Sequence, residues 1–112
     1  MSKINIEFTL FSAFYSPLIS TMTGGFLKEE GLDFEFTISA PGVSAITALD
    51  NGSADVIQST LSQGFNTLNK GEIPSCVHFA QINEMDGFFL TGRDADPEFK
   101  WNKLEGAEVL VH

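Results

Sequence analysis

The sequence predicts an α/β domain in which a mainly parallel sheet is flanked by helices. The clearest indication is the stretch 24–36, which reads GGFLKEEGLDFEF. Its first half has the apolar and charged positions of a helix end, and Gly31 can take the positive φ that ends a helix. Leu32, Phe34 and Phe36 then alternate with polar residues, which is the period of a strand with one buried face. The same order of strand and helix recurs along the chain, and it favours parallel strands joined by helical crossovers.

The individual elements follow from apolar periodicity and from the turn residues between them. Strands are predicted at 4–10, 33–38, 54–57, 74–80, 87–91 and 107–111. Helices are predicted at 17–27, 43–49 and 61–68. Pro17 suits a first helical turn, and Asn51-Gly52 and Lys70-Gly71 are typical helix stops. At 112 residues, the chain is expected to form one domain.

In parallel sheets of this kind, ligands bind beyond the carboxyl ends of the strands. This rule singles out four loops, at 11–16, 39–44, 58–60 and 81–86. Their neutral hydrogen-bonding groups and aromatic rings suit a small polar molecule with a flat or apolar part. The same residue types favour turns and helix caps, so a purely structural role stays open at this point. The loop residues concerned are Ser12, Phe14, Tyr15, Ser16, Ser44, Gln58, Ser59, Thr60, Gln81 and Asn83.

Composition excludes several classes of partner. Hydrophobic residues make up 43% of the 112 residues, with 11 phenylalanines, as in a globular protein. The net charge of −9 argues against nucleic-acid binding and against anionic membrane surfaces. No apolar run reaches the length of a membrane span. The first residues show no secretion-signal pattern, which leaves a cytoplasmic protein or a signal outside this sequence as the alternatives.

Two small clusters invite a metal-site interpretation, but the sequence favours neither. Cys76 and His78 share one face of a predicted strand, yet a lone cysteine is more typical of a buried apolar position. Asp94 and the acidic residues after it suggest a calcium loop, but Phe99 stands where that loop requires glycine. We therefore predict no metal, no cofactor and no catalytic residue.

Five segments together resemble a known family. They are the aromatic loop with Tyr15 and Pro17, GGFLKEEGLDFEF (24–36), NGSADVIQST (51–60), NKGEIPSCVHFAQIN (69–83) and LEGAEVLVH (104–112). In this order and spacing the chain resembles the solute-binding proteins of ABC importers. The resemblance is to the nitrate, sulfonate/taurine and thiamine-pyrimidine-precursor group, which includes the thiamine-precursor synthases of fungi.

The resemblance implies a type II periplasmic-binding fold, in which two α/β lobes close on a solute. Residues 1–112 then correspond to the N-terminal lobe, and 104–112 to the crossover strand that leads to the missing lobe. The implied activity is non-covalent binding of a small polar or aromatic solute, in the periplasm or another extracytoplasmic compartment, for delivery to an ABC permease. The family's ligand loops fall on Ser12, Phe14, Tyr15, Pro41, Gly42, Val43, Gln58, Ser59, Thr60, Gln81 and Asn83, and the predicted helix start adds Ser44.

Alternatives to the solute-binding lobe remain. One is a thiamine-precursor synthase, which needs a lysine for pyridoxal phosphate and a reactive histidine, although the lysines are predicted away from the four loops. Another is a stand-alone ligand-sensing or interaction module. The only arginine, Arg93, lies outside the loops, which favours a flat neutral solute over a strongly anionic one. An exposed sheet edge also suggests a homodimer, with or without exchanged segments.

Overall fold

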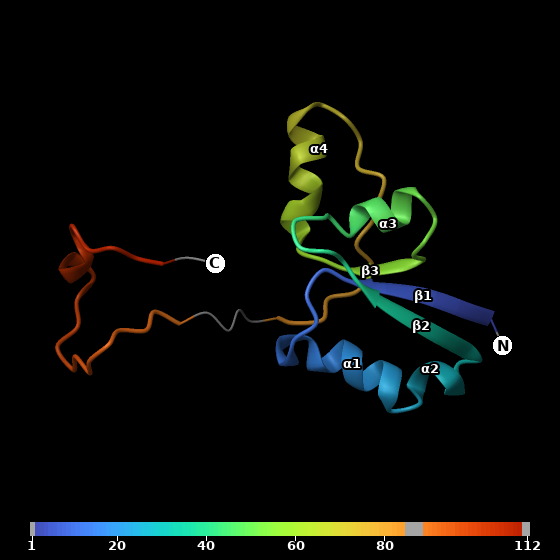
Figure 1. Ribbon diagram of the computed structural model, residues 1–112, viewed down its shortest axis with the longest axis horizontal. Coiled ribbons are helices and arrows are strands. Elements are labelled where there is room, and N and C mark those ends of the chain that lie inside the picture. The colour runs from blue at the N-terminus through green and yellow to red at the C-terminus, as the bar shows by residue number, and fades with distance from the viewer. Residues whose placement is uncertain (1, 85–88, 111–112) are drawn as a thin grey trace.

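The computed structural model describes residues 2–84 and 89–110, and its core is a three-stranded parallel sheet in the order β2-β1-β3 (Figure 1). The strands are β1 (Ser2–Phe8), β2 (Leu32–Ile38) and β3 (Val56–Gln58). Ile6 of the central strand lies beside Phe36 on one side and Val56 on the other. The predicted α/β class and its parallel sheet are therefore confirmed, with strand ends shifted by one or two residues.

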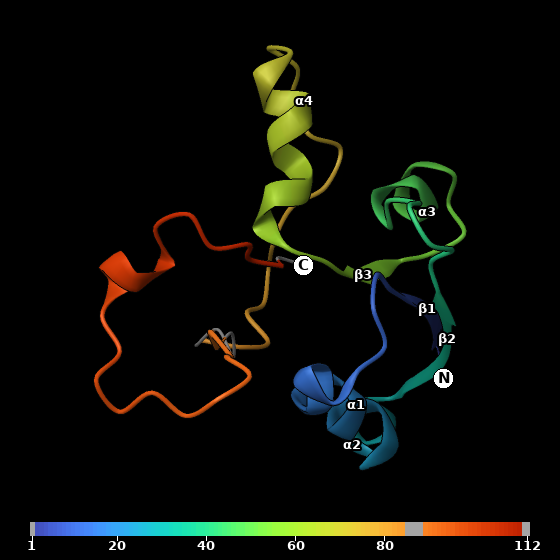
Figure 2. The same ribbon diagram turned by 60° about the vertical axis from the view of Figure 1, so that its left-hand side comes forward.

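Helices cover both faces of this sheet. Between β1 and β2 the chain forms η1 (Ala13–Tyr15), α1 (Ser16–Thr23) and α2 (Phe26–Glu29). Beyond β2 it forms α3 (Ile46–Asp50), and beyond β3 it forms η2 (Leu61–Gly64) and α4 (Phe65–Asn69). Figures 1 and 2 show α1 and α2 on one face and α3 on the other, with α4 standing out from the body.

The core lies between the sheet and α1. Ile6 and Phe8 of the central strand are buried together with Met22 of α1, and Phe8 is 0% exposed. Leu18, Ile19 and Leu27 pack around them. Burial of these side chains fixes the alternation of β1, because a shift of one residue would turn the apolar set to the opposite face.

Glycines explain both the confirmed and the corrected helix ends. Gly31 has φ of +76°, and its N–H donates to Lys28 O at 3.0 Å, as expected for a helix stop. The single helix predicted over 17–27 is wrong, because α1 ends before Gly24 and α2 begins at Phe26. Gly25 between them has φ of +87°, which interrupts the right-handed helix.

Three predicted strands are not formed by the described residues. The segments 74–80, 89–91 and 107–110 carry no strand, although the first alternates in sequence. A strand is stabilised by a hydrogen-bonded neighbour, and the described sheet ends at β2 and β3. The remaining parts of these predictions, at 87–88 and 111, lie outside the described residues, as do 85–86 of the fourth candidate loop.

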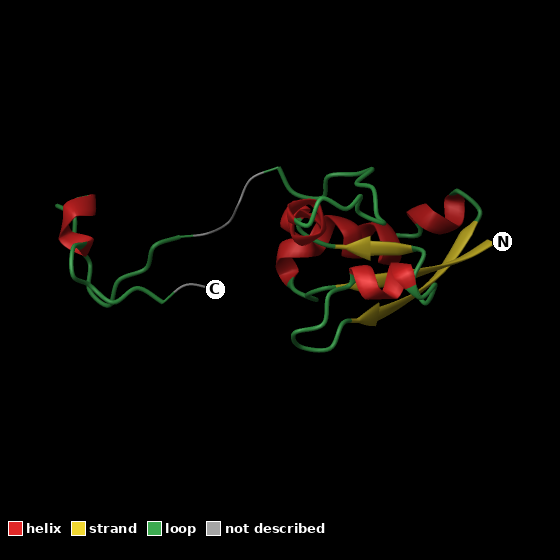
Figure 3. Cartoon of the chain, turned by 90° about the horizontal axis from the view of Figure 1, so that it is seen from above, coloured by secondary structure: helices red, strands yellow, loops and turns green. Residues whose placement is uncertain are grey.

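Residues 89–110 form an extended segment beside the body, seen in Figures 1 and 3. The radius of gyration is 18.4 Å, against about 13 Å for a compact domain of 100 residues. Within the segment, Lys103 belongs to the short helix η3 (Trp101–Leu104), and its Nζ lies 2.7 Å from Asp96 Oδ2. The described residues contain no helix both long and apolar enough to cross a membrane.

Candidate functional site

A hollow of about 360 Å³ opens at the carboxyl edge of the sheet, on the face that carries α3. This volume falls in the range of small-molecule sites, about 300–1,000 Å³. Its position agrees with the rule for parallel α/β sheets. The lining residues are Thr9, Ala40, Pro41, Gly42, Val43, Ser44, Gln63 and Asn66.

One wall of the hollow is the turn that follows β2. Val43 N donates to Ala40 O at 3.0 Å, and Gly42 has φ of +78°. Proline followed by such a glycine is the pattern of a type II turn. Ser44 Oγ then accepts from the backbone N–H of Ile46, the first residue of α3, at 3.3 Å. The turn chemistry therefore holds this loop in a defined shape beside the sheet.

A network of side-chain hydrogen bonds joins the loop after β2 to the end of β1. Thr9 Oγ1 donates to Gln58 O at 2.8 Å and accepts from Gln63 Nε2 at 3.4 Å. Ser44 Oγ donates to Gln63 Oε1 at 3.2 Å. Gln63 in η2 thus connects the end of β1 with the loop after β2, and all three side chains line the hollow.

Gln58 has a different place from the one predicted. The sequence assigns it to a loop, whereas the structure makes it the last residue of β3, with only 3% of its surface exposed. Its Oε1 accepts from Leu10 N at 3.4 Å. The next two residues leave the sheet, and Thr60 Oγ1 lies 2.8 Å from Ser62 Oγ at the start of η2. Gln58 therefore ties the chain leaving β1 to β3.

A second group of candidates lies at the same edge but on the face of α1. Phe11 stacks on Phe36 at 5.4 Å between ring centroids, and Phe14 meets Tyr15 edge-on at 5.3 Å. Asn83 Nδ2 donates to Phe14 O at 2.9 Å, which attaches the segment 81–84 to this aromatic loop. The side chain of Gln81 bonds Asn83 O at 3.0 Å.

The structure therefore divides the predicted site residues into three groups. The hollow gathers Pro41, Gly42, Val43 and Ser44, whereas Ser12, Phe14, Tyr15, Gln81 and Asn83 belong to the aromatic side, and Gln58, Ser59 and Thr60 lie in and after β3. Sequence reasoning missed Thr9, Gln63 and Asn66. A signal existed for the last two, since residues three apart share one face of a helix.

Cys76 and His78 line another hollow, of about 200 Å³. Their neighbours there are Leu61, Gly64, Phe65, Leu68 and Pro74, so the surroundings are apolar. Within the ranges 2–84 and 89–110, no group of three histidine, cysteine, aspartate or glutamate side chains gathers to hold a metal. This hollow is an apolar gap where α4 packs against the segment that follows it.

Comparison with known proteins finds one similar sequence. The chain is 29% identical over 110 residues to "Putative binding protein YtlA" of Bacillus subtilis (strain 168). The match covers 98% of this chain and 33% of the relative, so the chain spans about a third of the length of the curated relative it matches. No family model matches, and no solved structure matches. Nearly the whole chain is therefore similar to one part of a protein described as a binding protein.

Proposed function

We propose that this chain is a solute-binding lobe, which captures a small polar or aromatic molecule at the carboxyl edge of its sheet without changing it chemically. The observation that carries this proposal is the hollow of about 360 Å³, bordered by the ends of β1 and β2 and by η2 and α4. Its fixed turn and its Thr9–Gln63–Ser44 network form a largely pre-arranged polar surface. The similarity to a described binding protein supports the same function.

The hollow and the aromatic side supply different contacts in this proposal. The hollow provides amide and hydroxyl groups, whereas the aromatic side provides Phe14 and Tyr15 for packing against a flat ring. An open site of this kind buries only part of a solute. Tight capture then requires a second wall, which a further lobe of a two-lobe type II fold would supply.

The wider context is also part of the proposal. By its resemblance to importer proteins of the nitrate, sulfonate/taurine and thiamine-precursor group, the lobe would act outside the cytoplasm and deliver its solute to an ABC permease. A second copy of the chain is the alternative source of the missing wall, because β2 is an edge strand with exposed apolar side chains such as Ile38.

The direct test is ligand binding with a matched pair of variants. The purified chain is screened by thermal shift against an aminopyrimidine, taurine and nitrate, since a ligand that binds only the folded state raises its stability. Asn66→Ala removes a lining amide, whereas Asn69→Ala removes the same side chain one turn along α4, outside the lining. We expect the first variant to weaken binding about three- to tenfold, the worth of one hydrogen bond, and the second to leave it unchanged.

Two results would contradict the proposal. One is a folded chain that shows no shift with any ligand class. The other is a shift that both asparagine variants reduce equally, because binding would then lie outside the hollow. Heteronuclear NMR of the same samples locates the contact surface independently.

A further inference from the structure

The hydroxyl protons of the hollow are already used within the protein. Thr9 Oγ1 donates to Gln58 O, and Ser44 Oγ donates to Gln63 Oε1. Hydrogen-bonded anions need donors, and each hydroxyl has only one proton to give. The described lining contains no lysine, arginine or histidine. An anionic solute would therefore find the side-chain amides of Gln63 and Asn66 as donors, but no free hydroxyl proton from Thr9 or Ser44 and no positive charge in this lining.

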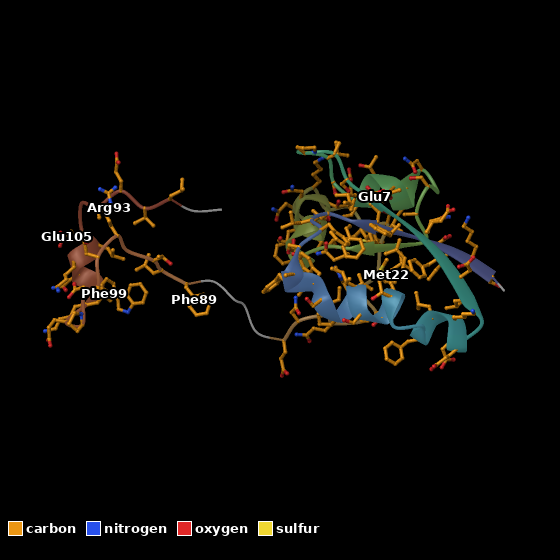
Figure 4. All side chains as sticks on the ribbon, turned by 60° about the horizontal axis from the view of Figure 1, so that its bottom comes forward. Glu7, Met22, Phe89, Arg93, Phe99 and Glu105 are labelled. Atoms are coloured by element: carbon orange, nitrogen blue, oxygen red, sulfur yellow. The ribbon has the colours of Figure 1, made fainter. Side chains whose placement is uncertain are left out.

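A carboxylate lies next to the hollow on the same side of the sheet. Glu7 is the last residue but one of β1, two positions before Thr9 of the lining, and it contacts Ser39, which directly precedes Ala40 of the lining. Glu7 is half-buried, and Figure 4 shows it on the side of the sheet opposite to Met22. Its oxygens accept from Thr37 Oγ1 at 3.0 Å and from Ser39 Oγ at 2.5 Å.

The charges on this face do not offset Glu7. Lys3 Nζ lies 2.6 Å from Glu35 Oε1 toward the amino end of the strands. Asp55 accepts from Asn5 N at 2.8 Å, also toward that end. Among the described residues, the ion pairs are Lys3–Glu35 and Lys103–Asp96, and neither includes Glu7. Hydroxyl donors satisfy lone pairs of the Glu7 carboxylate, but they leave its negative charge in place.

We infer that Glu7 makes the hollow select small organic cations and N–H-rich solutes over anions. This inference rests on the proposed function, because it names the class of solute that the proposed site takes. A half-buried carboxylate attracts a cation and repels an anion across a short distance of reduced dielectric. The hydroxyls of Thr9 and Ser44 also favour such solutes, because their protons are already donated within the protein and their oxygen lone pairs can accept from N–H groups.

The test uses three probes of nearly equal shape: benzamidine as the cation, benzamide as the neutral form and benzoate as the anion. Dissociation constants are measured by NMR titration of the wild-type chain. We expect benzamidinium to bind about fivefold or more tightly than benzamide, with benzoate weakest. Raising the ionic strength from about 0.01 M to 1 M should reduce this preference, because the screening length falls from about 30 Å to 3 Å.

Glu7→Gln is the decisive variant, and Glu35→Gln is its matched control. Glutamine keeps an acceptor oxygen for one of the two hydroxyls and removes the charge. Glu35 lies in the middle of the neighbouring strand, and its carboxylate pairs with Lys3. We expect E7Q to lose the preference for benzamidinium while it still binds benzamide, and E35Q to behave as the wild type. The salt titration of the wild-type chain decides the question if E7Q does not fold.

The outcomes separate the two proposals. If none of the three probes binds although a ligand of the thermal-shift screen does, the proposed function stands and the inference fails. If benzamide binds but benzoate binds as tightly as benzamidinium, the site stands and the charge selection is wrong. If E7Q keeps the wild-type ranking, or salt leaves the ranking unchanged, Glu7 is not the residue that selects the charge.

Discussion

The chain contains two regions of similar hydrophobicity but different structure. Residues 2–69 form the sheet and its helices, with Ile6 and Phe8 almost fully buried. Residues 73–110, apart from the undescribed 85–88, carry many apolar side chains that face solvent, such as Ile73 at 92% exposed and Phe79 at 77%. The difference shows that an apolar pattern specifies structure only where a neighbouring element completes the burial.

The same difference is visible in the hydrogen bonding. Every residue of β1 pairs with β2, and the end of β1 also pairs with β3. The segment 74–80 alternates as regularly in sequence, but it forms no ladder with the described strands. Pro74 and Cys76 face α4, whereas Val77 and Phe79 remain exposed.

The largest expected effect compares two phenylalanines, one from each region. Phe8→Ala removes a fully buried ring, and we expect it to lower the free energy of unfolding by about 3–5 kcal/mol. Phe79→Ala removes an exposed ring, and we expect a change within about 0.5 kcal/mol. Urea unfolding followed by circular dichroism measures both. A large loss from Phe79→Ala would show that the second region packs in solution.

An intermediate effect concerns association between copies. If the exposed edge of β2 pairs with a second chain, light scattering should show a mass that rises with concentration toward twice 12.2 kDa. Ile38→Lys places a charge at the end of that edge strand and should weaken the association. Ser20→Lys adds the same charge on α1 and serves as the control. A constant monomer mass at all concentrations would exclude this use of the edge.

The part of the fold that could be predicted is the part determined by local rules. Alternation along β1 and β2, Pro17 at the start of α1 and Gly31 after α2 each act over a few residues, and the structure confirms them. The two glycines Gly24-Gly25 indicate a helix break, but the apolar residues on both sides favour one continuous helix in a prediction from periodicity. The strands predicted after residue 73 depended on distant partners, which local periodicity does not encode.

The site was predictable at the level of loops and less so at the level of side chains. The rule for parallel sheets placed the turn 40–44 correctly at the carboxyl edge. The sequence predicts Gln58 in a loop because the predicted strand ends one residue early, and the burial of Gln58 depends on its pairing with Phe8. Gln63 became important only through contacts with Thr9 and Ser44, which are far from it in sequence.

The smallest expected effect compares two glycines, again one from each region. Gly31 has φ of +76°, a conformation that strains any residue with a Cβ, and open space surrounds that position. We therefore expect Gly31→Ala to destabilise the chain by about 1 kcal/mol through the backbone alone. Gly92 lies in the extended segment without a positive φ, and a Cβ there would meet only Asp94 O at 3.5 Å, an ordinary contact. Gly92→Ala should leave the unfolding midpoint unchanged, because no packed structure depends on that residue. Equal losses from the two variants would mean that the segment after residue 89 is as well ordered as the sheet, and the contrast between the two regions would then disappear.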